Sequence, residues 1–466
     1  MSEIIEASSE VGLYGAFDVV VCGGGPAGCA AAVSAARHGA RTLVIEKNGF
    51  LGGATVSQLV AVILSTNGAD FSGIWFEYIR RLKKLDGVRG PFRVPGLHEV
   101  RGAVDPEAVK RVWDELVTEA GVKILHHAYV SDVIKDGAKA VGVVVETIAG
   151  RKAVEAKCIV DATADGIVAA AAGVPWEQGD GTNLWAMSLT KVLRMGNVHL
   201  VGDRADDETM AKLEADLDAC LVRGDYTTEV MTTKRRILNY YRGRGWRLPE
   251  KRHEFINVIS RVLKTNPLDT REVTAAERLG RKQAWEAADF LRRFAPGFEK
   301  AYLLDTAEHI GVRSSRRIKG LCKVTDDDAF YLKSYPDAIA QSSWSIDIWP
   351  ADSYTAPSVD QTSDFAVARK ARLEAGECFG IRYGCLVTDG VDNLLTAGRC
   401  ISASHVAESS LRIQQTCMAT GQAAGTAAAL AADAGTTPRE LDALEVVRVL
   451  AEDRAAVEPL TFEEGR

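Results

Sequence analysis

The sequence has few of the features that indicate a metal centre, a nucleic-acid partner or secretion. Its nine cysteines include no C-x-x-C pair, so neither a zinc nor an iron–sulfur site is predicted. The formal net charge is −7 and no basic run is present, which argues against nucleic-acid binding. Residues 1–10 are acidic and polar, without a charged-then-apolar signal pattern, so we expect a cytoplasmic protein.

Long uninterrupted apolar runs are also missing. The run from Val19 to Ala36 is broken by a glycine-rich loop, which favours a buried strand and helix over a membrane span. The run from Met418 to Ala432 consists of small residues and is interpreted in the same way. The 466 residues exceed the usual size of one hydrophobic core, so two or more domains are expected.

A glycine-rich turn after the first apolar strand is the most informative motif. Residues 17–22 form the strand, and Gly23, Gly25 and Gly28 follow with G-x-G-x-x-G spacing. The first glycine permits the tight turn, the second lets a pyrophosphate approach the backbone, and the third lets helix and strand pack closely. Pro26 suits the first helical turn, where its missing N–H costs little.

A second strand completes the dinucleotide-binding unit. It covers residues 41–45 and ends at Glu46, about 20 residues after the glycines, where a carboxylate can accept hydrogen bonds from a ribose. Strand, helix, second strand and acid are in register, which predicts a dinucleotide site.

The order of the remaining elements predicts an α/β fold with a discontinuous Rossmann-like domain. Its parallel sheet would receive an inserted β-meander with strands near 129–134 and 141–148, and another apolar strand would follow at 158–162. We assign residues 1–174 and 375–435 to this cofactor domain and residues 175–374 to a mixed α+β substrate or cap domain. Residues 436–466 would form a helical tail whose helix starts at Thr437–Glu440, a capping-box pattern.

Three features favour FAD over NAD as the dinucleotide. Only one convincing G-x-G-x-x-G is present, the strand after the meander ends in Asp161-Ala162-Thr163, and a late strand ends in Ala397-Gly398-Arg399. That late strand could return to the cofactor and close over its ribityl chain, which an NAD-only dehydrogenase would not need.

With these motifs the sequence resembles FAD-dependent oxidoreductases related to the flavoproteins of succinate dehydrogenase and fumarate reductase. The resemblance covers about residues 17–450 and is carried by residues 49–55, 311–320 and 392–425. It implies a glutathione-reductase-like fold with FAD bound in an extended conformation. The cofactor-binding residues that it implies, together with the glycine-loop residues, are Gly23, Gly25, Pro26, Ala27, Gly28, Glu46, Lys47, Gly52, Gly53, Ala54, Val130, Asp161, Ala162, Thr163, Gly166, Gly398, Arg399, Ser410 and Leu411.

Three positions depart from the pattern of this group. Ala164 replaces the glycine usual after Asp-Ala-Thr, Ser314 stands where glutamate is common, and Trp349 stands where histidine is common. The last two lie in the expected substrate region, so the group's substrates are not carried over to this chain.

Three residues are candidates for the chemistry. His405 titrates near neutral pH and could act as acid or base, or it could be a structural histidine under the flavin. Arg313, next to Arg316 and Arg317, could hold a substrate carboxylate, or this arginine group could bind FAD phosphate or form interdomain salt bridges. Arg412 could stabilise negative charge on the flavin or bind substrate.

We therefore predict an FAD-dependent oxidoreductase that transfers a hydride between a small organic substrate and flavin N5. The alternatives are an NAD(P)H-fed flavin reductase of an unsaturated acceptor and a flavoprotein subunit that passes electrons to a protein partner. The electron acceptor is left open, and a homodimer is the expected assembly.

Overall fold

The computed structural model describes residues 10–68, 71, 73–94, 99–185, 187–202, 204–243, 246–248, 253–352, 354 and 364–453. Its largest sheet has seven strands in the order β6-β2-β1-β9-β8-β7, with β18 also paired to β9. These strands are β1 (Gly12–Cys22), β2 (Thr42–Ile45), β6 (Lys123–Leu125), β7 (Tyr129–Asp136), β8 (Lys139–Thr147), β9 (Gly150–Asp161) and β18 (Leu394–Thr396).

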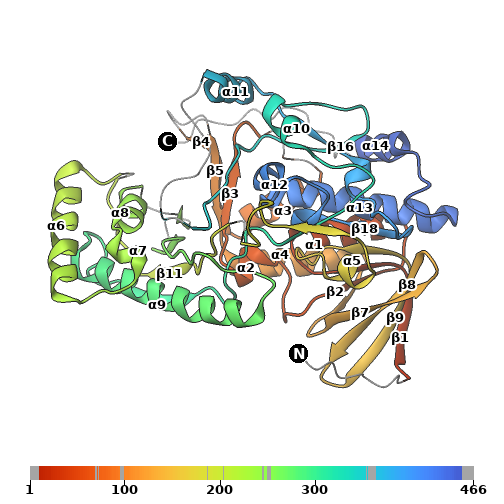
Figure 1. The fold of residues 1–466 in the computed structure, drawn as a ribbon, viewed down its shortest axis with the longest axis horizontal. Helices are drawn as coiled ribbons and strands as arrows, with labels where there is room; N and C mark the ends of the chain where they lie inside the picture. Colours follow the sequence, from red (N-terminus) through yellow and green to blue (C-terminus); the bar gives the residue numbers. More distant parts are fainter. Residues whose placement is uncertain are drawn as a thin grey trace.

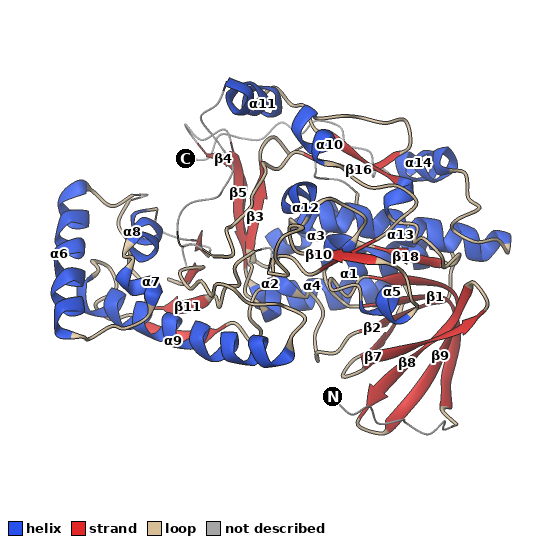
Figure 2. Ribbon diagram, in the orientation of Figure 1, coloured by secondary structure: helices blue, strands red, loops and turns tan. Residues whose placement is uncertain are grey.

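The sheet has a parallel part and an antiparallel part. Strands β6, β2, β1, β9 and β18 pair in parallel, whereas β7, β8 and β9 form an antiparallel meander. Figure 2 shows the meander as long strands at one end of the molecule. The predicted α/β fold, a parallel sheet with an inserted meander, is therefore confirmed.

Strand β1 is longer than the sequence pattern predicts. It begins at Gly12 rather than at Phe17, because its first half pairs with residues 152–156 of β9. Because β9 pairs with β1 on one side and with β8 on the other, it joins the parallel part of the sheet to the meander.

Helices α1 (Pro26–Arg37) and α13 (Gln414–Ala434) pack with their backbones almost in contact. A Cβ at Gly421 would lie 2.1 Å from the carbonyl oxygen of Ala27, and one at Gly425 would lie 2.1 Å from that of Ala31. Figure 1 shows the two helices side by side although they come from opposite ends of the chain. The small residues of 418–432 therefore serve a helix–helix contact.

In the described part of the chain, no helix combines the length and apolar character needed to cross a membrane.

A second sheet lies beside the first and was not predicted. It has the order β3-β5-β4 and consists of β3 (Val62–Ser65), β4 (Val88–Val94) and β5 (Glu99–Val104). Helices α2 (Ala54–Ser57), α3 (Ile74–Lys84) and α4 (Pro106–Glu119) pack near this sheet, whereas α5 (Ile167–Ala171) packs on β7 and β9 of the large sheet.

The middle of the chain forms a lobe of mixed structure, at the left in Figure 1. Its four-stranded sheet has the order β12-β13-β11-β14, from β11 (Leu193–Gly196), β12 (Trp246–Arg247), β13 (Phe255–Asn257) and β14 (Tyr302–Thr306). Its helices are α6 (Asp207–Arg223), α7 (Glu229–Thr232), α8 (Arg235–Arg242) and α9 (Thr270–Phe294). A separate hydrophobic core lies within it. The domain boundaries proposed above stay a prediction.

Short elements connect this lobe to the late part of the chain. They are the strand pair β10 (Trp176–Gln178) and β15 (Arg316–Ile318), the pair β16 (Ala338–Ser342) and β17 (Phe379–Arg382), and helices α10 (Asp326–Tyr331), α11 (Asp364–Glu374) and α12 (His405–Leu411).

The predicted start of the last helix is wrong. Glu440 does accept a hydrogen bond from the backbone N–H of Thr437 at 3.0 Å, but these residues form a turn. Helix α14 covers Ala443–Glu452, and the Asp442 side chain caps it by accepting from the Leu444 N–H. Residues 1–9 and 454–466, including most of the acidic N-terminal stretch, lie outside the described residues.

Candidate functional site

The carboxyl ends of four parallel strands meet at one edge of the large sheet. The Gly23 N–H after β1 donates to the Ile45 carbonyl of β2 at 2.8 Å. The Ala162 N–H after β9 donates to Cys22 at 2.9 Å, and the Ala397 N–H after β18 donates to Asp161 at 3.0 Å. Crevices at this edge of open α/β sheets are where ligands bind.

The glycines of the first loop have different tasks. Gly23 has φ +104°, and a Cβ there would lie 2.5 Å from the Ala162 carbonyl oxygen. A Cβ at Gly28 would lie 1.8 Å from the Gly23 carbonyl oxygen. At Gly25 the nearest atom would be the Gly53 Cα at 3.8 Å. Two glycines are therefore required by packing, and the Gly25 backbone has an open side that a pyrophosphate can approach.

Glu46 is buried and fixes the shape of this loop. Its Oε2 accepts from the Gly24 N–H at 2.7 Å and its Oε1 from the Asn48 N–H at 2.8 Å. Each carboxylate oxygen has a second lone pair, which remains available to a ribose hydroxyl. Lys47 follows and is exposed to solvent. Val130, the residue expected near adenine, is buried in β7.

A second glycine pair packs directly on the first loop. The Gly52 N–H donates to the Gly24 carbonyl at 2.8 Å. Gly53 has φ +48°, and a Cβ there would lie 2.6 Å from the Gly25 Cα. Helix α2 starts immediately afterwards at Ala54. The two glycine turns and Glu46 therefore form one continuous surface, called the cradle below, which Gly52 and Gly53 extend away from Glu46.

The turn after β9 is held by a buried carboxylate. Asp161 accepts from the Thr163 N–H at 3.0 Å, the Thr163 hydroxyl at 2.6 Å and the Ala169 N–H at 2.9 Å. Burial raises the pKa of Asp161 although these hydrogen bonds oppose the shift. Ala164 has φ +66° and Gly166 has φ +61°, so the left-handed turn persists although alanine replaces the usual glycine.

The late segment returns to the glycine loop, as predicted. A Cβ at Gly398 would lie 3.0 Å from the Ala27 Cβ. Arg399, however, directs its guanidinium to the Asp165 Oδ1 at 2.6 Å and to the Ser315 Oγ at 2.8 Å. Burial alone would raise the pKa of Asp165, but Arg399 and Ser315 lower it.

Two buried hydroxyl groups next to the cradle fit a bound cofactor. The Oγ1 atoms of Thr55 in α2 and Thr416 in α13 have no hydrogen-bond partner among the described residues. They belong to two of the segments that carry the resemblance, residues 49–55 and 392–425. Ser410 and Leu411, which were expected to bind the cofactor, are buried in α12, where the Ser410 hydroxyl donates to the Ser345 carbonyl at 3.0 Å.

His405 does not titrate near neutral pH, which corrects the expectation that it can act as acid or base there. Burial and the positive charges of Arg317 and Arg412 lower the pKa of His405 to about 4, although Asp180 opposes the shift. Its Nδ1 is buried without a hydrogen-bond partner among the described residues. The imidazole is therefore neutral at pH 7.

Arg313, Arg316 and Arg317 do not form one basic group. Arg313 donates to the Ser188 carbonyl at 2.6 Å and to the Thr190 hydroxyl at 2.8 Å. Arg316 lies over the Trp176 ring, and Arg317 pairs with Glu408 at 3.3 Å. Arg316 and Arg317 are successive residues of β15 and point to opposite faces, whereas Arg313 lies before this strand and points to a third environment.

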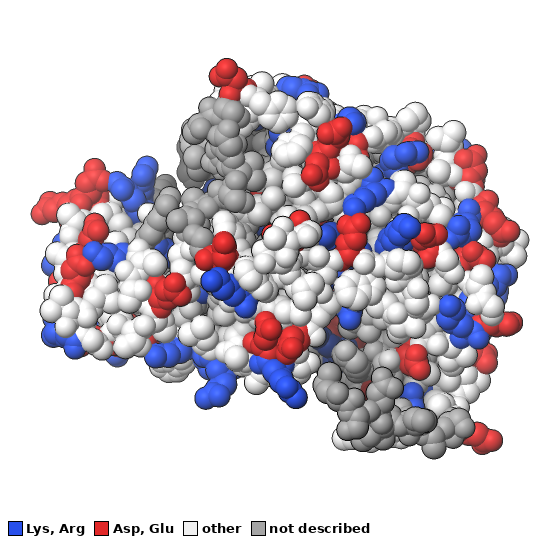
Figure 3. Space-filling view, in the orientation of Figure 1, with Lys and Arg blue, Asp and Glu red and all other residues white. Residues whose placement is uncertain are grey.

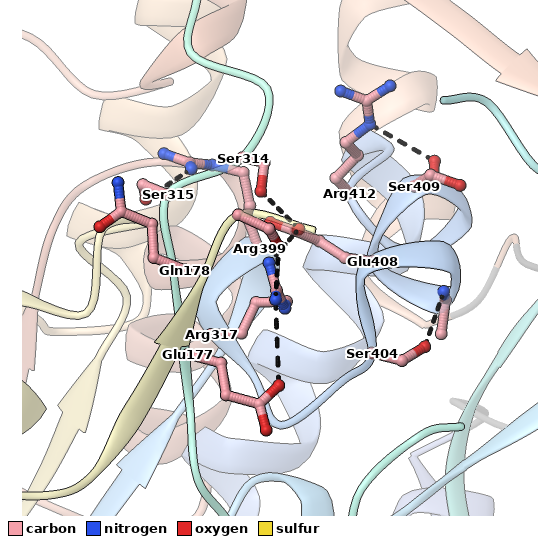
Figure 4. Close-up of polar contacts among 12 residues, drawn as sticks. Glu177, Gln178, Ser314, Ser315, Arg317, Arg399, Ser404, Glu408, Ser409 and Arg412 are labelled. Atoms are coloured by element: carbon pink, nitrogen blue, oxygen red, sulfur yellow. Dashed lines mark hydrogen bonds and ion pairs between the residues drawn. The ribbon is translucent and has the colours of Figure 1, made fainter. Parts of the chain in front are cut away.

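Glu408 is a buried acidic residue that the sequence analysis missed. Its Oε2 accepts from the Ser314 hydroxyl at 2.6 Å and lies near Arg317, while its Oε1 has no partner among the described residues. Figure 4 shows Glu408 directed towards Ser314 and Arg317, with Arg412 at the other end of the same helix. Burial raises the pKa of Glu408, opposed by Arg317 and Ser314. The unusual serine at position 314 was the only signal in the sequence.

Strand ends bounded by glycine turns and a buried acid are typical of a dinucleotide-binding protein of the α/β class. A family model described as FAD dependent oxidoreductase matches residues 18–450. The chain belongs to this family, so it is an FAD-dependent enzyme.

Curated relatives match parts of the chain. A thiamine thiazole synthase of Aeropyrum pernix is 33% identical over 130 residues, 28% of this chain and 43% of the relative. A thiamine thiazole synthase of Sulfolobus acidocaldarius is 29% identical over 232 residues, 47% of this chain and 76% of the relative. The tRNA uridine 5-carboxymethylaminomethyl modification enzyme of Desulfitobacterium hafniense is 32% identical over 146 residues, 29% of this chain and 22% of the relative. The chain thus spans less than half of the length of the first and third of these relatives.

Among solved structures, a geranylgeranyl bacteriochlorophyll reductase-like protein of Thermoplasma acidophilum is similar over 95% of this chain and 84% of its own. The identity is 14% and the TM-score 0.46.

Proposed function

We propose that the protein transfers a hydride between a carbon atom of a small organic substrate and N5 of its flavin. The observation that carries this proposal is the cradle formed by Gly25, Glu46, Gly53 and Gly398 at the strand ends, in a chain of the FAD dependent oxidoreductase family. FAD supplies the two-electron redox chemistry, and the protein supplies binding, orientation and proton handling.

In this proposal, different described residues bind different parts of FAD. The open backbone at Gly25 and the uncapped first turn of α1 hold the pyrophosphate, since a helix N-terminus favours negative charge. Glu46 accepts from the adenosine ribose, and the unpartnered hydroxyls of Thr55 and Thr416 donate to the flavin ring system.

His405 orients the substrate in this proposal. Because the imidazole is neutral at pH 7 and its Nδ1 lacks a partner among the described residues, it can accept a hydrogen bond from a substrate hydroxyl or amine. A pKa of about 4 makes it a weak base, and its imidazolium form is scarcely populated at pH 7, so its charge state does not select a direction of the reaction.

The test is anaerobic flavin reduction by the FAD-loaded enzyme. Hydroxy acids, amines, sugars and enoates are screened for loss of the flavin absorption band, and a hit is repeated with deuterium on the reacting carbon. We expect bleaching by one class, slowed by deuterium and by His405→Asn but not by His199→Asn, a change at a histidine of the lobe that contacts Asn197. Bleaching by NADH or NADPH alone would instead support the flavin-reductase alternative and overturn the proposal.

Three finer points are also proposed. The relation to succinate dehydrogenase and fumarate reductase flavoproteins, a cytoplasmic location and a homodimeric assembly rest on the sequence motifs and composition alone. Light scattering of the purified holoenzyme tests the dimer.

A further inference from the structure

Three arginines from different parts of the chain surround one indole ring. The guanidinium carbons of Arg261, Arg236 and Arg313 lie 5.0, 5.3 and 5.9 Å from the centre of the Trp349 ring. Arg236 comes from α8, Arg261 follows β13, and Arg313 precedes β15. The middle lobe and the segment leading to β15 therefore meet at this point.

Two of these guanidinium groups, those of Arg236 and Arg313, are oriented by neutral acceptors. Arg236 donates to the carbonyl oxygens of Ile259 and Val258, and Arg313 donates to a carbonyl and a threonine hydroxyl. Within the described part of the chain, neither of these two arginines forms an ion pair. Asp347, whose charge acts on Arg313, is already paired with Arg412, so positive charge is in excess at this point.

Repulsion between these arginines contributes to lowering the pKa values of Arg313 and Arg261. Burial, with repulsion from Arg412 and Arg236, lowers the pKa of Arg313 to about 9. Burial, with repulsion from Arg236, lowers the pKa of Arg261 to about 10. Like charges held close together in a partly buried place repel one another, so a bound anion would stabilise this group.

The arginine group adjoins the expected flavin side of the site. Arg412, at the end of α12, donates to the Asp347 carbonyl at 2.7 Å and pairs with its carboxylate at 3.1 Å. Asp347 lies two residues before Trp349, so the arginines around the indole stand next to the segment that contacts Arg412. Arg313, Trp349 and Arg412 are partly exposed, whereas Arg236 and Arg261 are buried, so a ligand would reach the group from the side of Arg313.

The visible surface has no comparable concentration of charge. On the face in Figure 3, acidic and basic side chains are interspersed, as on an ordinary protein surface. The guanidinium groups gathered around Trp349 thus differ from the mixed charge of that face. Guanidinium groups bind carboxylate and phosphate oxygens through paired hydrogen bonds.

We propose that Arg236, Arg313 and the neighbouring Arg261, arranged around Trp349, bind the oxyanion group of the substrate, a carboxylate or a phosphate. The substrate of this oxidoreductase is then a small organic anion whose charged end is held at Trp349 and whose reacting carbon faces the flavin. This inference rests on the proposed function for its catalytic meaning, but the anion site is tested independently of turnover.

The first experiment measures anion binding by the FAD-loaded enzyme, in which the cofactor's own phosphate sites are filled. Inorganic phosphate, sulfate and acetate are titrated at constant ionic strength, with the flavin difference spectrum and the thermal midpoint as readouts. We expect saturable binding that is weakened at least tenfold in Arg313→Gln and partly recovered in Arg313→Lys. Preference for phosphate or for acetate identifies the type of oxyanion.

Arg382→Gln is the matched control. Its guanidinium also lies over an aromatic ring, Tyr335, at 5.0 Å, but it is paired with Asp337 at 3.0 Å. This variant should bind the anions as the unmodified chain does. No saturable binding, or equal binding by Arg313→Gln and Arg382→Gln, would overturn the anion site.

A second measurement uses the enzyme without any substitution, so it does not depend on whether a variant folds. Phenylglyoxal modifies accessible arginines, and peptide mass spectrometry of the holoenzyme locates the modified residue. We expect phosphate to protect Arg313 and leave Arg382 unprotected; equal labelling of Arg313 with and without phosphate would refute the proposal. If anions bind and protect but no substrate class reduces the flavin, the proposed hydride transfer fails while the anion site stands.

Discussion

The Ser314 hydroxyl donates a hydrogen bond to the Glu408 carboxylate at 2.6 Å, and Arg317 lies 3.3 Å from the same oxygen. Glutamate is common at position 314 in the group that this sequence resembles. In this chain serine stands there, and the carboxylate beside Arg317 comes from α12. Side-chain exposure of 4% for Arg317 and 1% for Glu408 places this ion pair in the interior.

Glu408→Gln should destabilise the protein by about 3 kcal/mol, because removing one member of a buried ion pair leaves the other charge without compensation. Denaturant unfolding of the holoenzyme measures the loss. The control is Glu445→Gln, which breaks the exposed pair with Arg448 and should cost less than about 1 kcal/mol. Equal effects of the two substitutions would contradict a buried pair.

His405 should make stability depend on pH between about 6.5 and 4. In this window the unfolded chain binds a proton at His405, whereas the folded chain does not until about pH 4. Lowering the pH therefore favours unfolding, with a loss from this residue of about 2 kcal/mol between pH 7 and pH 5. The free energy of unfolding of His405→Asn should fall less over the same interval. The same fall in both proteins would rule out this role for His405.

Gly25 and Gly28 should respond differently to the same substitution. Gly25→Ala has space for its Cβ, so the apoprotein should keep its stability while FAD affinity falls at least tenfold, because the methyl group occupies the pyrophosphate approach. Gly28→Ala collides with the Gly23 carbonyl and should cost roughly 1–3 kcal/mol of stability. Apoprotein unfolding and FAD titration separate the two effects; a destabilised Gly25→Ala apoprotein would show that this glycine serves packing too.

Ala164→Gly should stabilise the protein by up to about 1 kcal/mol. The left-handed conformation at φ +66° costs an alanine roughly 1–2 kcal/mol, and the greater freedom of glycine in the unfolded chain offsets part of the gain. Ala172→Gly, at φ −72° in the same region, should destabilise instead. Chemical denaturation of the two variants decides the matter, and stabilisation by both would point to another cause.

Sequence patterns predicted the features that depend on short stretches of backbone. Gly23 and Gly28 are required by atoms within a few residues of them or in the adjoining strand, so their spacing alone predicted the turn. The start of β1 at Gly12 depends on pairing with β9 and was missed. The strand β4 contains glycine and proline, which are depleted in strands, so its sheet was missed as well.

The chemistry of the site depended on distant residues and was predicted less well. Adjacent positions suggested one basic group at 313–317, but Arg313 lies before β15 and contacts Trp349, whereas Arg317 lies within β15 and pairs with Glu408. The pKa of His405 is set by burial and by Arg317 and Arg412. Trp349 stood out in the sequence as an unusual residue, but its three guanidinium neighbours come from segments far apart in the chain.

The close contact between α1 and α13 also bears on how the protein is made. Helix α1 leaves the ribosome early, yet the face that receives Gly421 and Gly425 stays uncovered until those two residues have been synthesised. Strand β18 and Gly398, which lie at the same edge of the sheet, also arrive late. A nascent chain that has not yet reached these residues therefore lacks part of the cofactor cradle.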